Sequence, residues 1–123
     1  MTGQEVYNLA LSFVPELQSE VPDLDDYKVG WVNLAIAEAL ETENSIRRFY
    51  GEEELLTAPR LKSLSETIPY HDSVTQTALA YGVAEHAFVD DDNDYRSNKA
   101  RSKFIVALNE AAKYTITDIV DCY

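Results

Sequence analysis

Apolar residues recur at helical spacing in several stretches of the chain, and the first stretch begins close to Met1. Its apolar residues share one face of a helix: Val6, Leu9, Ala10, Phe13 and Leu17. Thr2 and Glu5 have the spacing of a capping box, in which each side chain satisfies a free backbone N–H of the other. We therefore expect a first helix within residues 1–18. Because Pro15 lies inside the pattern, this helix should end or kink near Val14.

The second stretch follows an acidic connector and predicts a long helix over residues 26–50. Gly51 is the expected stop. Its main apolar stripe contains Tyr27, Trp31, Leu34, Ala35 and Ala39. Trp31 continues this stripe, so we interpret it as a core residue rather than a ligand-stacking one.

Two further helices are predicted, over residues 72–89 and 94–114, joined by an acidic turn. Ala78 and Gly82 lie four residues apart on the third helix and form a groove of small residues. Gly82 costs about 1 kcal/mol in a helix interior relative to alanine, so close packing against another helix is its expected compensation. Apolar residues of the fourth helix also lie on one face: Phe104, Ala107, Leu108 and Ala111.

Helical spacing is absent between residues 52 and 71 and beyond residue 115. The first of these segments is a proline-bearing loop with five large aliphatic residues, so we expect part of it to pack on the body and the rest to contact a partner. Residues 115–123 are rich in β-branched side chains and predict a short extended tail that folds back or adds to a partner as an edge strand. The sequence thus predicts one all-α domain over residues 1–123, a small bundle of about four helices.

The chain carries 22 acidic and 10 basic residues, a net charge of −12. This balance disfavours affinity for nucleic acid, which needs clustered Lys and Arg, and for anionic membranes. It serves solubility, or it provides a surface past which DNA slides without being held. No apolar run approaches the ~20 residues of a membrane helix, and Met1–Tyr7 lacks the charge pattern of a secretory signal. The single cysteine, Cys122, fits a reducing compartment.

Motifs for chemistry are lacking in the sequence. Asp90, Asp92 and Asp94 have the first spacings of a calcium loop, but the glycine and glutamate that such a loop requires are replaced by Tyr95 and Arg101. His71 and His86 are the only histidines. Glu85 and His86 are adjacent and project about 100° apart, so we expect them not to share a site locally. With no zinc-ligand spacing, nucleophile–base pair or phosphate loop, we predict no catalytic residues, no metal site, no cofactor and no enzymatic activity.

Basic residues of the fourth helix follow a helical pattern at Arg96, Lys99 and Lys103. They form either a solvated face that balances the acidic turn or a stripe that docks onto the acidic face of an identical neighbour. Together with apolar residues of the loop and tail, they make up the candidate partner contacts: Leu55, Leu56, Leu61, Leu64, Arg96, Lys99, Lys103, Ile116, Ile119, Val120 and Tyr123.

The layout of the chain resembles the small head–tail connector proteins of tailed bacteriophages, also called adaptor or head-completion neck proteins. The segments that carry the resemblance are T-G-Q-E-V-Y, I-P-Y-H-D-S-V, A-L-A-Y-G-V-A-E-H-A-F and D-I-V-D-C-Y. The resemblance implies a virion structural protein, assembled in the host cytoplasm and located in the neck. It would form a ring of twelve subunits beneath the portal, contact the portal and a neighbouring neck or tail protein, and let DNA pass without specific binding.

A second hypothesis is a small acidic protein-binding module, for example an inhibitor that imitates DNA. Such a protein needs carboxylates on one continuous surface, whereas the acidic residues here cluster at the connectors, over residues 20–26, 52–54 and 90–94. This clustering favours the connector hypothesis.

Overall fold

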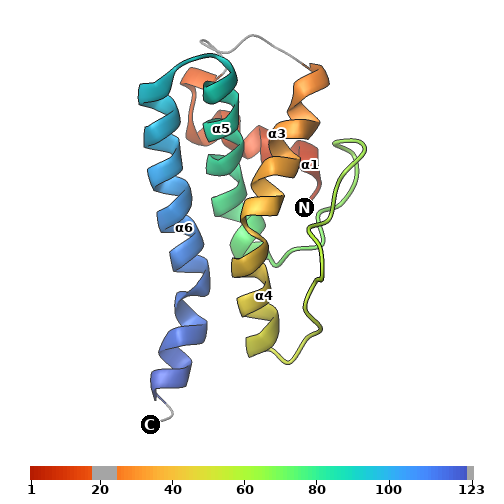
Figure 1. Ribbon diagram of the computed structural model, residues 1–123, viewed down its shortest axis with the longest axis vertical. Helices are drawn as coiled ribbons and strands as arrows, with labels where there is room; N and C mark the ends of the chain where they lie inside the picture. Colours follow the sequence, from red (N-terminus) through yellow and green to blue (C-terminus); the bar gives the residue numbers. More distant parts are fainter. Residues whose placement is uncertain (18–24, 122–123) are drawn as a thin grey trace.

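The computed structural model describes residues 1–17 and 25–121, with side chains described over 1–17 and 27–113. Within these residues the chain forms five α-helices and one π-helical turn, and the predicted all-α class is confirmed (Figure 1). The elements are α1 (Gly3–Phe13), α3 (Asp25–Glu38), α4 (Leu40–Phe49), η1 (Val74–Ala78), α5 (Leu79–Asp90) and α6 (Asp94–Asp121).

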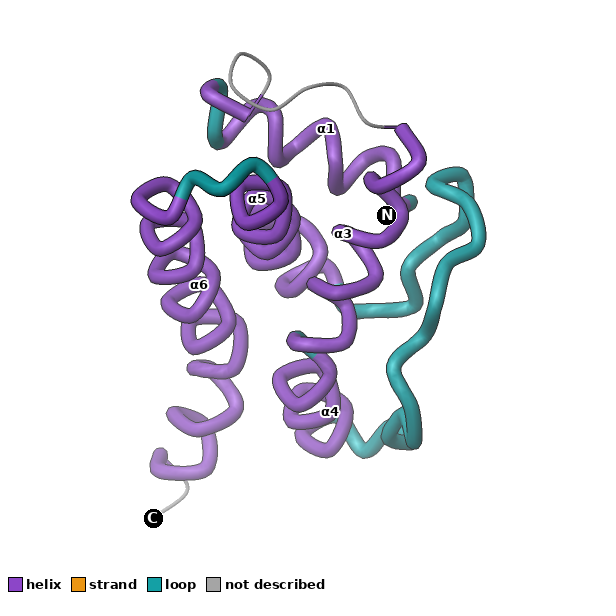
Figure 2. The backbone as a smooth tube through the Cα atoms, turned by 45° about the horizontal axis from the view of Figure 1, so that its top comes forward, coloured by secondary structure: helices purple, strands orange, loops and turns teal. Residues whose placement is uncertain are grey.

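Helix α5 is the centre of the fold, since it packs against α1, α3 and α6 (Figure 2). Its Gly82 explains how these helices approach so closely. A Cβ atom built there would lie 2.9 Å from Cβ of Ala35 on α3 and 3.0 Å from ring atoms of Phe104 on α6. The predicted close packing at Gly82 is therefore confirmed, with two neighbouring helices.

Helix α1 begins with the predicted capping box. The Thr2 hydroxyl accepts from the Glu5 N–H at 3.1 Å, and Oε1 of Glu5 accepts from the Thr2 N–H at 2.9 Å. The helix ends at Phe13 with Val14 as its C-cap, before Pro15, as the sequence predicts.

The predicted second helix is divided into α3 and α4. Ala39 separates them with φ −89° and ψ −1°, a backbone conformation outside the usual α-helical range. The buried residues of α3 also differ in part from the predicted stripe, because Tyr27 and Leu34 are exposed. Trp31 is a core residue, as predicted, and its indole N–H donates to Oδ2 of Asp90 at 2.6 Å.

The segment between α4 and η1 is an irregular strap held against the helices by side-chain amides. Asn44 both donates to the Leu55 carbonyl and accepts from the Leu55 N–H, at 3.0 and 2.8 Å. Asn33 makes the same pair of bonds with the backbone of Leu61, at 2.9 and 2.8 Å. An isolated antiparallel bridge joins Thr2 to Thr67. Leu61 and Ile68 of this segment are buried in the core, and Leu55 and Leu64 are partly buried against it.

The predicted third helix begins with a π turn rather than a regular α-helix. The Leu79 N–H donates to the Val74 carbonyl, five residues back, and the wider turn lets Val74, Thr75 and Ala78 all face the core. The α-helical part, α5, then runs to Asp90.

Helix α6 continues to Asp121, so the prediction of an extended tail from residue 115 is wrong for the backbone described. The β-branched residues of this stretch have slightly lower helix propensity, but no proline or glycine follows Asp94. Because each residue added to an existing helix gains a hydrogen bond, the helix propagates through them.

None of the described helices combines the length and the hydrophobicity that a membrane crossing requires.

Candidate functional site

An open apolar groove runs between η1, α5 and α6, with a volume of about 620 Å³. We call it the α6 groove. It is lined by Ser73, Thr77, Tyr81, Ser102, Lys103, Val106, Ala107, Glu110 and Ala111. Small side chains on both walls leave the space open, and Val106 at its edge is 60% exposed. Such a groove suits an apolar side chain or helix from a partner.

The same part of α6 is only partly covered by the rest of the molecule. Phe104 is buried, but Ala107, Leu108 and Ala111, which continue the predicted core stripe, are half-buried. A second hollow of about 330 Å³ lies beyond the groove, between α4 and α6, and shares Ser73 and Ala111 with it. The uncovered surface is therefore continuous from α5 to the end of α4.

One end of the α6 groove is formed by aromatic and basic side chains. Nζ of Lys103 lies 5.7 Å from the centre of the Tyr81 ring, and this ring stacks on Phe13 at 5.4 Å. Lys103 thereby offers a positive charge beside an apolar surface. Glu110 lies on the same lining, so the groove presents both signs of charge to a partner.

The three predicted basic residues occupy one side of α6. Nη1 of Arg96 lies 3.3 Å from a carboxylate oxygen of Glu16 near the end of α1. The pKa of Glu16 is held below its ordinary value, first by a hydrogen bond from its own backbone and then by the charges of Arg96 and Lys99. Lys99 and Lys103 are exposed, so they are the members of this stripe that face solvent most fully.

The four leucines predicted as partner contacts are separated by the strap. Leu61 is 5% exposed and belongs to the core, and Leu55 and Leu64 are partly buried against it. Their burial follows from the hydrogen bonds that the side-chain amides of Asn33 and Asn44 make with the strap backbone, because these bonds hold the strap on the helices. Leu56, at 96% exposed, is the one of the four that projects into solvent.

Three of the predicted contacts near the C-terminus belong to α6. Ile116, Ile119 and Val120 lie on the helical backbone of α6, and their side chains fall outside the described residues. Tyr123 also lies outside them.

The strap and α6 lie on opposite sides of the molecule, with α5, α3 and α4 between them, in both views (Figures 1 and 2). Leu56 belongs to the strap, whereas the α6 groove is lined by residues of η1, α5 and α6. Head-to-tail contact between identical subunits joins two different patches of the surface.

A buried polar network holds the strap where it meets η1. Glu43 on α4 is fully buried and accepts from Nε of Arg47 at 2.6 Å and from the His71 N–H at 2.8 Å. Arg47 also donates to the carbonyls of Glu53 and Pro69. Nδ1 of His71 lies 2.9 Å from Glu43, and Nε2 lies 3.1 Å from Glu52. The network therefore ties both ends of the strap to α4.

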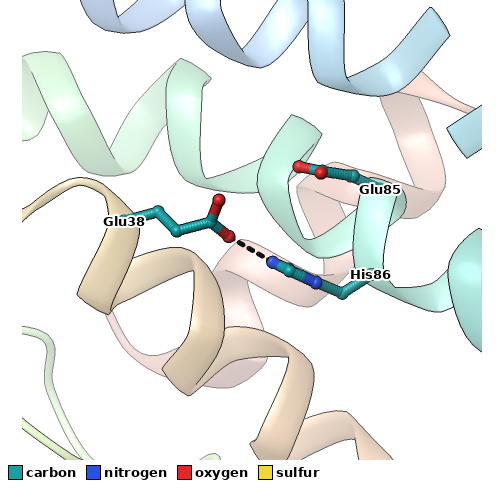
Figure 3. A group of neighbouring side chains, drawn as sticks. All are labelled: Glu38, Glu85 and His86. Carbon is teal, nitrogen blue, oxygen red and sulfur yellow. Dashed lines mark hydrogen bonds and ion pairs between the residues drawn. The ribbon is translucent and has the colours of Figure 1, made fainter. Parts of the chain in front are cut away.

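A second polar cluster joins α3, α5 and α6. Nε2 of His86 contacts Oε1 of Glu38, and Glu85 lies beside them (Figure 3). The potential ligand atoms of Glu38, Glu85 and His86 all lie within 4.8 Å of one another. The expectation that Glu85 and His86 do not share a site is therefore wrong. Their long side chains span the angle between adjacent helical positions, and a third residue arrives from α3, which the sequence does not indicate.

The acidic turn between α5 and α6 shows no calcium-loop geometry. Asp90 accepts the indole hydrogen bond of Trp31, and Asp92 has a positive φ of 55° that closes the turn. These aspartates terminate one helix and begin the next.

Comparisons of the chain with protein-family models, curated proteins and solved structures find no match.

Proposed function

We propose that this chain is a non-enzymatic virion structural protein, a head–tail connector that forms a ring under the portal for DNA passage and tail attachment. The proposal starts from the resemblance of its sequence layout to connector proteins. The observation that carries it furthest is the presence of two different apolar surface features, the exposed Leu56 on the strap and the α6 groove. In a ring, Leu56 of one subunit would enter the α6 groove of the next.

Charge supports the same arrangement. The strap that bears Leu56 begins with three consecutive glutamates, Glu52–Glu54, and the α6 side offers Lys99 and Lys103. Contact between these sides brings opposite charges together, which favours the correct register of neighbouring subunits. The net charge of −12 suits a channel wall that does not hold DNA.

The test is the mass of the purified protein in solution, measured by light scattering, alone and then with the portal protein of the genome that encodes it. A species of about twelve subunits, or stoichiometric binding to the portal, is expected. Leu56→Ser and Val106→Ser should each abolish the ring. Val89→Ser is the matched control, because Val89 is a half-exposed apolar residue at the end of α5 that lies outside the α6 groove.

A chain that stays monomeric at high concentration and does not bind the portal contradicts the proposal. Binding to a DNA-recognising protein in competition with duplex DNA would instead favour the acidic module.

A further inference from the structure

We infer that Glu38, Glu85 and His86 form a binding site for one divalent transition-metal ion, with Zn²⁺ as the best fit. The site joins α3 to α5, is separate from the α6 groove and does not depend on ring assembly. Two carboxylates and one imidazole supply three ligands, the number found in open zinc sites whose fourth position is taken by water.

The first observation is the convergence of the three side chains from two helices. Their ligand atoms lie within 4.8 Å of one another, and Figure 3 shows the three groups directed toward a common space. Ligand atoms around a tetrahedral zinc ion lie roughly 3.4 Å apart, given metal–ligand bonds of about 2.0–2.2 Å. Small rotations of these side chains, of which Glu38 is the most exposed, would close the difference.

The second observation is an unsatisfied oxygen. Glu85 is 5% exposed, and its Oε2 is buried without a hydrogen-bond partner. A carboxylate oxygen in this state loses its hydration without compensation, which is unfavourable by about 1–3 kcal/mol or more. A bound cation would satisfy it, and ion binding is one recognised reason for such a group in a folded protein.

Arg101 on α6 orients the two carboxylates. Its Nη1 lies 2.9 Å from Oε1 of Glu85 and 3.6 Å from Oε2 of Glu38. The guanidinium therefore takes one oxygen of each carboxylate and leaves Oε2 of Glu85 without a partner. Oε1 of Glu38 contacts Nε2 of His86, and an ion would replace this contact by binding both atoms. Arginine in this position acts as the outer-shell group that fixes ligands in metal sites.

The ligand chemistry selects among cations. An imidazole nitrogen favours Zn²⁺ and its neighbours in the transition series, whereas Ca²⁺ and Mg²⁺ require more oxygen ligands than this cluster offers. The ion would join α3 to α5 directly, and Arg101 would connect both helices to α6. Ion binding should therefore raise the melting temperature of the chain.

The experiment is titration of the full chain with Co²⁺, followed by its visible absorption, and with Zn²⁺ by calorimetry. We expect one ion per chain, a tetrahedral cobalt spectrum displaced by Zn²⁺, and no heat with Mg²⁺ or Ca²⁺. His86→Gln should lower Zn²⁺ affinity at least about tenfold, and Arg101→Gln by about tenfold or more, the effect typical of outer-shell partners.

The controls are His71→Gln and Cys122→Ser, which remove the other imidazole and the only thiol. Both should bind as the parent chain does. Loss of binding in either control, or unchanged binding in His86→Gln, overturns the site, as does the absence of stoichiometric binding by the parent chain. If His86→Gln fails to fold, ring signals in the NMR spectrum of the parent chain decide the matter: Zn²⁺ should shift those of His86 and leave those of His71 unchanged.

Discussion

Nδ1 of His71 lies 2.9 Å from Oε2 of Glu43, a carboxylate with no exposed surface. The two residues are 28 positions apart in sequence, on the strap side of η1 and in α4. Their contact fixes the end of the strap at the helix that precedes it, and it makes the stability of the fold depend on pH.

Stability should fall as the pH rises through the range in which His71 loses its proton. Partial burial of the ring disfavours the charged form, but hydrogen bonds and charges from Glu43 and Glu52 outweigh it, so the pKa of His71 is raised. A raised folded-state pKa means that the contribution of His71 is fully present below the unfolded value of about 6.5 and is lost above the folded one. Urea unfolding of the parent chain and of His71→Gln at about pH 6 and pH 8.5 measures this contribution to the free energy of unfolding. The loss on raising the pH should be smaller in the variant; equal losses in the two proteins would contradict the assignment.

Removal of the Glu43 carboxylate should destabilise the fold strongly. Glu43→Ala leaves Arg47 and the His71 N–H without their shared acceptor, and breaking a buried ion pair from one side costs about 3–5 kcal/mol. Glu41→Ala is the matched control on the same helix, since the Glu41 side chain is almost fully exposed. It should change the free energy of unfolding by less than about 0.5 kcal/mol, measured by urea denaturation. Similar values for the two variants would show that the buried network contributes little.

Substitution by alanine should change the stability of the fold in opposite directions at two helical glycines. In Gly82→Ala the new Cβ would meet Ala35 and Phe104 at 2.9–3.0 Å, and such overpacking costs about 1–3 kcal/mol. At Gly30 the new methyl group meets nothing within 4 Å, so Gly30→Ala should stabilise α3 by roughly 0.4–1 kcal/mol. Melting temperatures give both results. Stabilisation by Gly82→Ala would mean that α3 and α6 separate readily at this point.

The strap should loosen locally when the hydrogen bonds from a side-chain amide to its backbone are removed. Asn44→Ala deletes both side-chain bonds to the Leu55 backbone, and a loss of about 1–3 kcal/mol follows from leaving those groups unpaired. Hydrogen exchange should show faster exchange of the Leu55 N–H, with the amides of α5 less affected. Asn109→Ala, at an exposed position on α6, is the control and should leave this exchange unchanged. Unchanged protection of Leu55 in Asn44→Ala would show that other contacts hold the strap.

Features that depend on a few neighbouring residues are predictable from this sequence. The capping box of Thr2 and Glu5, the end of α1 before Pro15 and the all-α class follow from local hydrogen bonding and helical periodicity. Burial of Trp31 and close packing at Gly82 were also predicted. Trp31 continues an apolar stripe, and a glycine inside a helix is unfavourable unless close packing compensates for it.

The candidate sites depended on contacts between distant residues, which a single sequence does not specify. Leu56 and Leu61 are the same residue type in one segment, but Asn33 holds the backbone of Leu61 against α3 and Leu56 is left in solvent. Glu38 reaches His86 from 48 positions away. The sequence by itself determined the helical class and the two ends of α1, since these depend on short-range energies. Tertiary structure decided the exposed face of α6 and the convergence of Glu38, Glu85 and His86, because each results from the packing of separate helices.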